Sequence, residues 1–333
     1  MVPNAVVPPG RVQRFSRERG GVRVELYFRT VAEVCTLVND VLRPGLAQLT
    51  GLNLVHKEPG DLVLNPLACA ALRQGREAEQ LPMNVAVHYS VKNSSVFKGR
   101  PPRVRDQGVD QSVAVMRCLE KYAHTCAVEK LLLVSGTNWR MPSLRATELL
   151  PSLPAPLRAS CGAAFNPYSH LLPESASGYV SETQESESLA RKLEHVQSVW
   201  LQFGTDVEAL RRGLESLRTL VLQVQRPESC GSIEIYGSLF VPTPSWRAKM
   251  RFRCWAGVLL SPDYLSDQAR AEQITQDILD VYYDFGVVPL IESPIRTQRD
   301  CLAASNCLAG LPTTTPSHQE RDAGGKRKRR DSR

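Results

Sequence analysis

The stretch KLLLVSG, residues 130–136, is apolar at consecutive positions and ends in a serine and a glycine. A strand with one face in water alternates apolar and polar residues, whereas a parallel strand covered on both faces reads as a continuous apolar run. Glycine is a common residue where such a run ends in a turn. This stretch therefore predicts a strand buried on both faces of a parallel sheet.

Seven further segments have strand character, and they alternate with segments of helical periodicity such as residues 31–41, 111–126 and 274–282. A regular alternation of this kind is typical of parallel βαβ units. A Ser- and Glu-rich loop is expected at residues 173–188, and a further extended piece at residues 256–260. The expected strands are residues 22–28, 52–56, 84–91, 130–136, 160–165, 198–203, 233–240 and 287–293.

Eight parallel strands joined by right-handed crossovers favour closure into a barrel, which needs roughly 250 residues. An open nucleotide-binding sheet would carry a Gly-rich phosphate loop after its first strand. Here the first strand is followed by Arg29, Thr30 and Val31, and neither G-x-G-x-x-G nor G-x-x-x-x-G-K-[ST] occurs. The fold class expected is α/β, a single (β/α)8 TIM barrel. The domain boundaries expected are a basic, disordered lead-in at 1–20, the barrel at 21–300 and a disordered basic tail at 301–333.

The net charge of +7 is located at the two ends of the chain. Residues 1–20 hold four arginines against one glutamate, and residues 320–333 hold seven lysines or arginines against three acidic residues, so residues 21–319 are neutral. A nucleic-acid-binding domain would concentrate basic residues on one face of its fold. The barrel is therefore expected to bind a small molecule and no nucleic acid. The run KRKRR, residues 326–330, fits a nuclear localisation segment or a solvated tail equally well.

The nine cysteines are scattered and form no C-x-x-C pair. This usage predicts reduced, mostly buried thiols, without a disulfide framework or a zinc site. No apolar run approaches the roughly 18 residues of a membrane span, and the N-terminus lacks the apolar core of a secretory signal. The expected location is the cytoplasm, with the nucleus (from the basic tail) and an organelle (from the Arg-rich N-terminus) as alternatives.

Polar residues near the carboxyl ends of the expected strands are the candidates for chemistry, because these ends meet at the active-site mouth of a barrel. Glu25 lies between apolar neighbours, so burial should raise its pKa and suit it to general acid catalysis. The structural alternatives are an ion pair for Glu25, a hydrogen-bonded core position for His88, and a tie between two strands for Gln202. The other candidates at strand ends are Ser135, Gly136, Thr137 and Arg296.

These residues lie in motifs that resemble those of the methylenetetrahydrofolate reductases, a family of flavin-dependent α/β barrels. The resemblance runs from Val22 to about Arg299. VRVELYF is similar to the family's V-S-F-E-F-F at Glu25, and AVHYSV to A-x-H-L-T-C at His88. Lys192 before LQF is similar to a basic helix before T-Q-F, and YGSLFVP to P-G-[IL]-x-P. The last helix and strand end in Arg296, as they end in an arginine in the family.

The resemblance implies an oxidoreductase of one-carbon metabolism. NAD(P)H would reduce bound FAD, and the flavin would pass a hydride to 5,10-methylenetetrahydrofolate. Glu25 would be the general acid, while Gln202 and Arg296 would contact the reduced folate. The flavin would be held by His88, Ser135, Gly136, Thr137, Phe165 and Lys192. No metal is expected, and self-association and the choice between NADH and NADPH are left open.

Two departures from the family support a second hypothesis. The family's R-G-D at the end of the fourth strand is replaced here by a segment ending in Ser135, Gly136 and Thr137. The family's A-A-Y-P-E signature reads AAFNP, with Phe165 in place of the tyrosine. The alternative to the reductase is therefore a barrel relative that has lost FAD or reductase activity and acts as a folate-binding, small-molecule-binding or regulatory protein.

Overall fold

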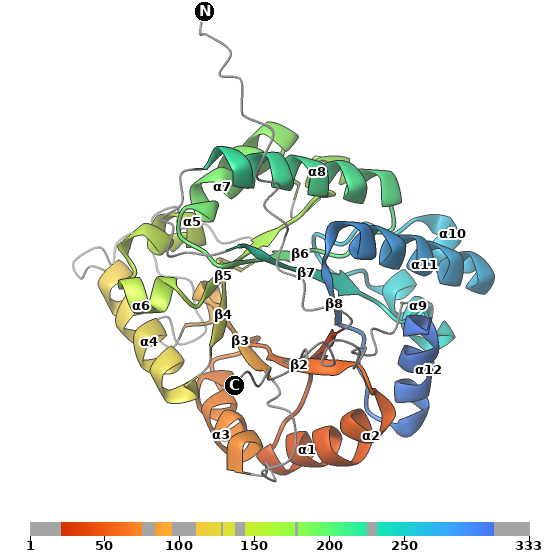
Figure 1. The fold of residues 1–333 in the computed structure, drawn as a ribbon, viewed down its shortest axis with the longest axis horizontal. Helices are drawn as coiled ribbons and strands as arrows, with labels where there is room; N and C mark the ends of the chain where they lie inside the picture. Colours follow the sequence, from red (N-terminus) through yellow and green to blue (C-terminus); the bar gives the residue numbers. More distant parts are fainter. Residues whose placement is uncertain are drawn as a thin grey trace, which may run out of the picture.

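The computed structural model describes residues 21–74, 84–94, 111–127, 129–136, 144–176, 179–224 and 232–309. Eight parallel strands pair in sequence order, and the last pairs with the first, so the sheet closes into a barrel (Figure 1). The strands are β1 Val22–Leu26, β2 Leu49–Leu54, β3 Asn84–Ser90, β4 Lys130–Val134, β5 Cys161–Phe165, β6 Ser198–Leu201, β7 Glu234–Leu239 and β8 Val288–Ile291. The predicted TIM barrel is confirmed, and each expected strand overlaps an observed one.

Helices surround the barrel and cover the outer face of the sheet (Figure 1). They are α1 Val31–Thr36, a π-helical turn Leu37–Leu42, α2 Arg43–Gly45, α3 Asp61–Gln74, α4 Gln111–Cys126, α5 Ala146–Leu149, α6 Ala155–Arg158, α7 Glu182–Leu193, α8 Val207–Gln223, α9 Pro244–Phe252, α10 Pro262–Ser266, α11 Gln268–Phe285 and α12 Gln298–Leu308. Three short 3₁₀ segments, Val91–Asn93, Leu150–Ser152 and Ser169–Leu171, complete the connections. None of the described helices is both long and apolar enough to span a bilayer.

Three expectations from the sequence are corrected by the structure. The segment expected as a loop to residue 188 is helical from Glu182, because Ser181 and Gln184 form a reciprocal cap at the start of α7. The barrel unit extends past residue 300, since α12 buries Cys301, Ala304 and Leu308 against it. Residues 256–260 form no strand, and only Leu259 makes an isolated bridge, to Gly204.

The apolar side chains form two separate cores. The larger core fills the space between the sheet and the surrounding helices. The smaller core lies inside the barrel and contains Ala86, Leu132, Trp200, Tyr236, Val288 and Leu290. The rings of Trp200 and Tyr236 stack with their centroids 4.1 Å apart. The middle of the barrel is therefore packed with side chains, and no channel runs through it.

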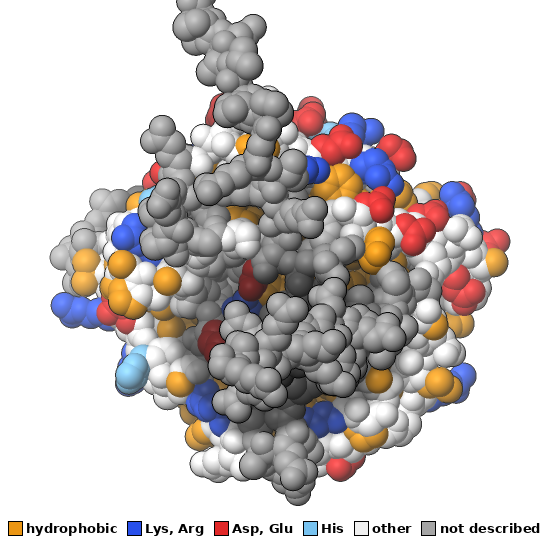
Figure 2. All heavy atoms as spheres, viewed as in Figure 1, with side chains coloured by type: hydrophobic (Ala, Val, Ile, Leu, Met, Phe, Trp, Pro, Cys, Tyr) orange, Lys and Arg blue, Asp and Glu red, His pale blue; other side chains and the backbone are white. Residues whose placement is uncertain are grey.

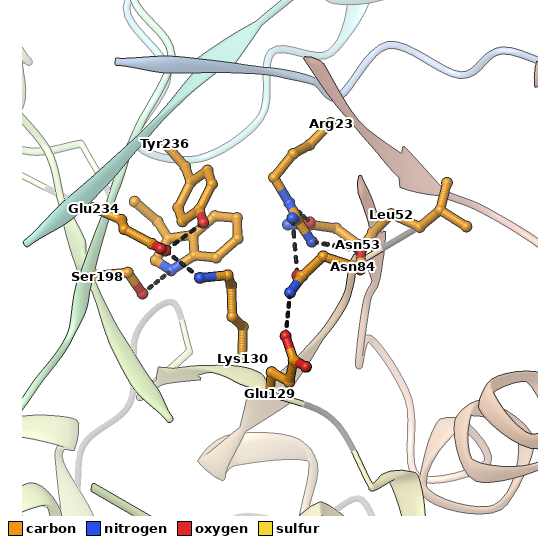
Figure 3. Close-up of polar contacts among 10 residues, drawn as sticks. Arg23, Leu52, Asn53, Asn84, Glu129, Lys130, Ser198, Glu234 and Tyr236 are labelled. Carbon is orange, nitrogen blue, oxygen red and sulfur yellow. Dashed lines mark hydrogen bonds and ion pairs between the residues drawn. The ribbon is translucent and has the colours of Figure 1, made fainter. Parts of the chain in front are cut away.

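The amino-terminal end of the barrel is closed by polar contacts, drawn in Figure 3. Lys130 and Glu234, the first residues of β4 and β7, form an ion pair, and Tyr236 Oη donates to Glu234 Oε2 at 2.6 Å. Asn84, the first residue of β3, donates to Glu129 Oε2 at 2.8 Å. Acidic and basic side chains are visible in the hollow at the centre of the molecule in the view down the barrel (Figure 2).

Arg23 connects this closed end to the middle of the barrel. Its side chain is only 1% exposed, and its guanidinium donates to Asn53 Oδ1, Asn84 Oδ1 and the Leu52 carbonyl at 2.8, 3.0 and 2.9 Å. The guanidinium carbon also lies 5.7 and 5.2 Å from the ring centroids of Trp200 and Tyr236. A buried cation is tolerated when its donors are satisfied in this way.

Candidate active site

Glu25 and Glu292 lie on neighbouring strands at the carboxyl-terminal end of the barrel. In the β1–β8 pairing Arg23 is opposite Leu290 and Val24 is opposite Ile291, so the next position places Glu25 opposite Glu292. Arg23 and Leu290 point into the barrel, and side chains alternate along a strand. Both carboxyl groups therefore point into the mouth of the barrel, which is the expected position of chemistry in this fold.

Glu25 is 6% exposed and has two polar partners. Tyr27 donates a short hydrogen bond to Glu25 Oε1, and Lys57 Nζ lies 3.8 Å from the same oxygen. Burial raises the pKa of Glu25, and the charge of Lys57 and the Tyr27 hydrogen bond oppose that effect. Burial likewise lowers the pKa of Lys57, opposed by Glu25 and Glu292. Glu25 thus has the environment predicted for a general acid, and also the ion pair of the structural alternative.

Lys57 is held between aromatic rings at the mouth. Its Nζ lies 3.7 Å from the ring centroid of Tyr27 and 5.3 Å from that of Trp255. Its side chain is 52% exposed, although the carboxyl group it contacts is buried. Lys57 therefore contacts Glu25 inside the mouth and is itself partly exposed to solvent at the open end of the barrel.

Glu292 has its pKa raised to about 8, first by burial and then by the nearby charge of Glu25. The Ser238 hydroxyl can donate either to the carbonyl oxygen of Leu201, at 2.6 Å, or to Glu292 Oε1 in a short hydrogen bond. The bond to Glu292 and the charge of Lys57 lower the pKa of this carboxyl group, but burial and Glu25 outweigh them. A pKa of about 8 favours a protonated Glu292 at neutral pH.

His88 points into the barrel from β3 and is held in one tautomer. Arg23 Nε donates to Asn53 Oδ1, which turns Asn53 Nδ2 toward His88 Nε2 at 3.1 Å. Because an amide nitrogen only donates, His88 Nε2 accepts and the ring proton is on Nδ1. Burial, Lys57 and Arg23 lower the pKa of His88 to about 3. His88 is therefore a neutral donor at every physiological pH.

Gln202 and Arg296 lie at the rim rather than beside the carboxyl pair. Gln202 follows β6, is half-buried, and its Oε1 accepts from the backbone N–H of Phe203 at 3.0 Å. Arg296 is exposed at the start of α12, where its backbone N–H donates to Asp300 at 3.0 Å. Of the four residues expected to share one cavity, Glu25 and His88 both point into the interior of the barrel. The folate contacts of Gln202 and Arg296 stay a prediction.

Three of the expected flavin contacts lie at the ends of β4 and β5. Ser135 Oγ accepts from Ala146 N at 2.9 Å and so caps the start of α5. Gly136 has φ +90°, which favours glycine, and lies against Lys92. Lys192 Nζ donates to the Ala164 carbonyl at 2.9 Å, and burial lowers its pKa. Thr137 lies outside the described residues.

Phe165 does not face the barrel interior, which corrects the expectation that it contacts the flavin. It belongs to the outer core, and a β-carbon added at Gly213 of α8 would stand 3.7 Å from its ring. Residues alternate sides along β5, so Ala164 is the neighbour on the inner face, and it is exposed there. The inner face of β5 is therefore built from small residues at the mouth.

Sequence reasoning missed Lys57, Glu292, Tyr27 and Asn53. Lys57 directly follows the predicted strand 52–56, and Glu292 is the penultimate residue of the predicted strand 287–293. The strand-end signal used for the other candidates was therefore present for both. Asn53 lies inside β2 and carries no local signal, because its importance depends on contacts with Arg23 and His88 from other strands. Among the described residues no group of three or more His, Cys, Asp or Glu side chains is arranged to hold a metal ion.

No protein-family model and no curated protein matches the chain. Among solved structures, an N-acetylneuraminate lyase from Mycoplasma synoviae is 10% identical, with a TM-score of 0.40 and 80% of each chain covered. The aldose reductase from Schistosoma japonicum is 9% identical, with a TM-score of 0.45, and the match covers 88% of this chain and 84% of that one. Such likenesses say nothing of a reaction, and the chain's own strand pairing establishes that it is a TIM barrel.

Proposed function

We propose that this protein is an enzyme that uses general acid chemistry at the mouth of its barrel on a small polar substrate. The observation that carries the proposal is the carboxyl pair of the buried Glu25 and the half-buried Glu292, next to Lys57. Two carboxylates and one ammonium would leave an excess negative charge in a buried site. A proton kept on Glu292 removes that excess, so the site holds a transferable proton near neutral pH.

The motif resemblance supports a specific form of this chemistry, the reduction of 5,10-methylenetetrahydrofolate. Glu292 then passes its proton to Glu25, and Glu25 delivers that proton to the substrate nitrogen as the five-membered ring opens. The carboxylate left on Glu292 takes up a new proton from solvent. Gln202 and Arg296, at the rim, would contact the folate. NAD(P)H would be the source of the hydride.

Two described residues, His88 and Lys192, fit a flavin at this mouth. His88 offers its Nδ1–H, fixed by Asn53. The space beside Gly136, after β4, is filled by the side chains of Lys92 and Ser90. Lys192 uses one of its N–H groups on Ala164 and has two more for a phosphate or carbonyl oxygen. Bound FAD would supply hydride transfer between the nicotinamide and the substrate. The residues of the chain would orient it and hold the proton.

The second candidate is a barrel that binds a reduced folate or another small molecule without FAD. It is favoured by the positions of Ser135 and Phe165. Both residues were expected to contact the flavin, but both have another role in the fold. Ser135 caps α5, and Phe165 packs on the outer face of β5.

The two candidates are separated by the absorption spectrum and by ligand binding. The reductase is expected to purify yellow, with a band at about 450 nm. The band should weaken in Lys192→Met and stay unchanged in the surface control Lys121→Met. A colourless protein that does not take up added FAD, yet binds a reduced folate in calorimetry, would contradict the reductase and support the binding protein.

A further inference from the structure

A cavity lies between the segments that follow β7 and β8. Its volume is about 220 Å³, and its lining includes Thr243, Ser245, Trp246, Lys249 and Ser293. A water molecule needs only ~15 Å³ measured in this way, so the cavity has room for a larger polar group. Thr243 follows β7 and Ser293 follows Glu292, which places the cavity at the loops where barrels often hold phosphate groups.

The indole N–H of Trp246 has no hydrogen-bond acceptor among the described residues. Its side chain is 5% exposed, and within the described parts of the chain its Nε1 finds no acceptor. The ring packs edge-on against Phe240 and Trp255, each with centroids 5.1 Å away, so it is firmly placed. A buried N–H without a partner is unfavourable, and an acceptor bound in the cavity that Trp246 lines would satisfy it.

Lys249 adds a positive charge to the same cavity. Its Nζ lies 4.9 Å from the ring centroid of Trp246, and the described residues place no carboxylate within ion-pair distance of it. The positive charge of Lys249 also acts on Lys57, since it helps to lower the pKa of Lys57. Because the described residues give Lys249 no acidic partner, a bound anion would stabilise its charge.

Asp300 is the acidic residue of the lining, and it is engaged elsewhere. Its Oδ2 accepts from the backbone N–H groups of Arg296 and Thr297 and from Thr297 Oγ1 at 3.0, 3.0 and 2.9 Å. These three donors form the cap of α12 and offset its charge. The remaining lining side chains named above are hydroxyls, an indole N–H and an ammonium, which are donors suited to an oxyanion.

We propose that this cavity is an oxyanion subsite that binds a phosphate or carboxylate group of the ligand. Lys249 supplies the charge, and Trp246 Nε1 supplies a neutral hydrogen bond. The subsite implies that the ligand carries an anionic group on the β7–β8 side of the mouth, with its reacting part near Glu25. The inference deepens the proposed function by describing the substrate, but it depends on neither a flavin nor turnover.

The test follows the indole N–H signals of the full chain by NMR. The chain has four tryptophans, and Trp246→Phe assigns the signal of Trp246 while keeping an aromatic ring in the core. Inorganic phosphate and acetate are titrated separately at fixed pH and ionic strength, with chloride as the control salt. The signal of Trp246 should shift saturably with phosphate or acetate and not with chloride. The anion that binds more tightly shows whether the subsite is suited to a phosphate group or to a carboxylate group of the ligand.

Lys249→Met should weaken the apparent affinity at least tenfold, whereas Lys121→Met, on the exposed face of α4, should leave it unchanged. Anions should also raise the Tm of the wild type and not that of Trp246→Phe. The inference is overturned if neither anion shifts the Trp246 signal, if chloride shifts it equally, or if Lys249→Met binds as the wild type does. Because no reaction is measured, these outcomes are independent of whether the protein is a reductase.

Discussion

Glu25 on β1 and Glu292 at the end of β8 lie opposite each other across the last pair of strands that closes the barrel. Two like charges in such positions repel, and Glu25 is buried and Glu292 half-buried, so the pair is stable only if a proton or a cation compensates them. The structure supplies a cation, Lys57 beside Glu25, and the raised pKa of Glu292, about 8, favours a proton on that carboxyl group. The closure of the barrel therefore creates the acidic site.

Replacing Glu292 by glutamine should change how stability depends on pH. The folded protein keeps a proton on Glu292 up to about pH 8, whereas the unfolded chain releases it near the ordinary value of 4.5. The wild type should therefore lose stability as the pH rises from about 4.5 to about 8. Glu292→Gln should lack this loss and be more stable than the wild type at pH 9 by ~5 kcal/mol, the free energy that corresponds to the shift from 4.5 to about 8.

Urea denaturation at several pH values measures this difference. Glu215→Gln, an exposed position on α8, is the matched control and should follow the wild type at every pH. Parallel stability curves for Glu292→Gln and the wild type would show that Glu292 is ionised in the folded protein.

Replacing Asn53 by aspartate should convert His88 into a titrating group. The amide now donates to His88 Nε2, and a carboxylate at this position could only accept. A protonated His88 would then gain an opposite charge, so its pKa should rise from about 3 by ~2 units or more. NMR of the histidine ring nitrogens measures the change, and an unaltered His88 signal between pH 5 and 7 would contradict the proposed hydrogen bond.

Replacing Arg23 by methionine should destabilise the barrel by ~3 kcal/mol. The change leaves the side chains of Asn53 and Asn84 and the Leu52 carbonyl without their buried donor. Arg218→Met, at an exposed position on α8, should change the free energy of unfolding by less than ~0.5 kcal/mol. Equal effects of the two substitutions would mean that the Arg23 contacts contribute little to stability.

Glu25→Gln should separate the two half-reactions of the proposed reductase. Reduction of the flavin by the nicotinamide cofactor needs no proton from Glu25 and should be nearly unchanged, whereas reduction of the folate should be lost. Stopped-flow absorbance measures the two steps separately. A similar loss in both steps would assign Glu25 to cofactor binding instead of acid catalysis.

The sequence predicted the fold well because its signal is local. The continuous apolar run at β4 and the helical spacing in α11 need no knowledge of distant residues. α7 and α12 were misjudged in part because their sequences are polar or lie near the basic tail. Their helical structure depends on reciprocal caps and on a few buried residues such as Leu189 and Leu308.

The candidate site was predicted only in part because its contacts depend on register. Glu25 was found from its apolar neighbours, but the position of Glu292 opposite it follows from the pairing of β1 with β8, some 270 residues apart in the chain. Phe165 was misplaced for the same reason, since a shift of one position along β5 exchanges the inner and outer faces. Strand ends are visible in a sequence, whereas the partners across the barrel are not.

The central claim is that the mouth of the barrel holds a protonated carboxyl group at neutral pH. Its most direct test is an NMR titration of the glutamate side-chain carboxyl carbons in the wild type and in Glu292→Gln. We expect one carboxyl signal of the wild type to titrate at about pH 8 and to be absent from Glu292→Gln. If every glutamate of the wild type titrates below about pH 5.5, a range ordinary for exposed carboxyl groups, the claim is contradicted.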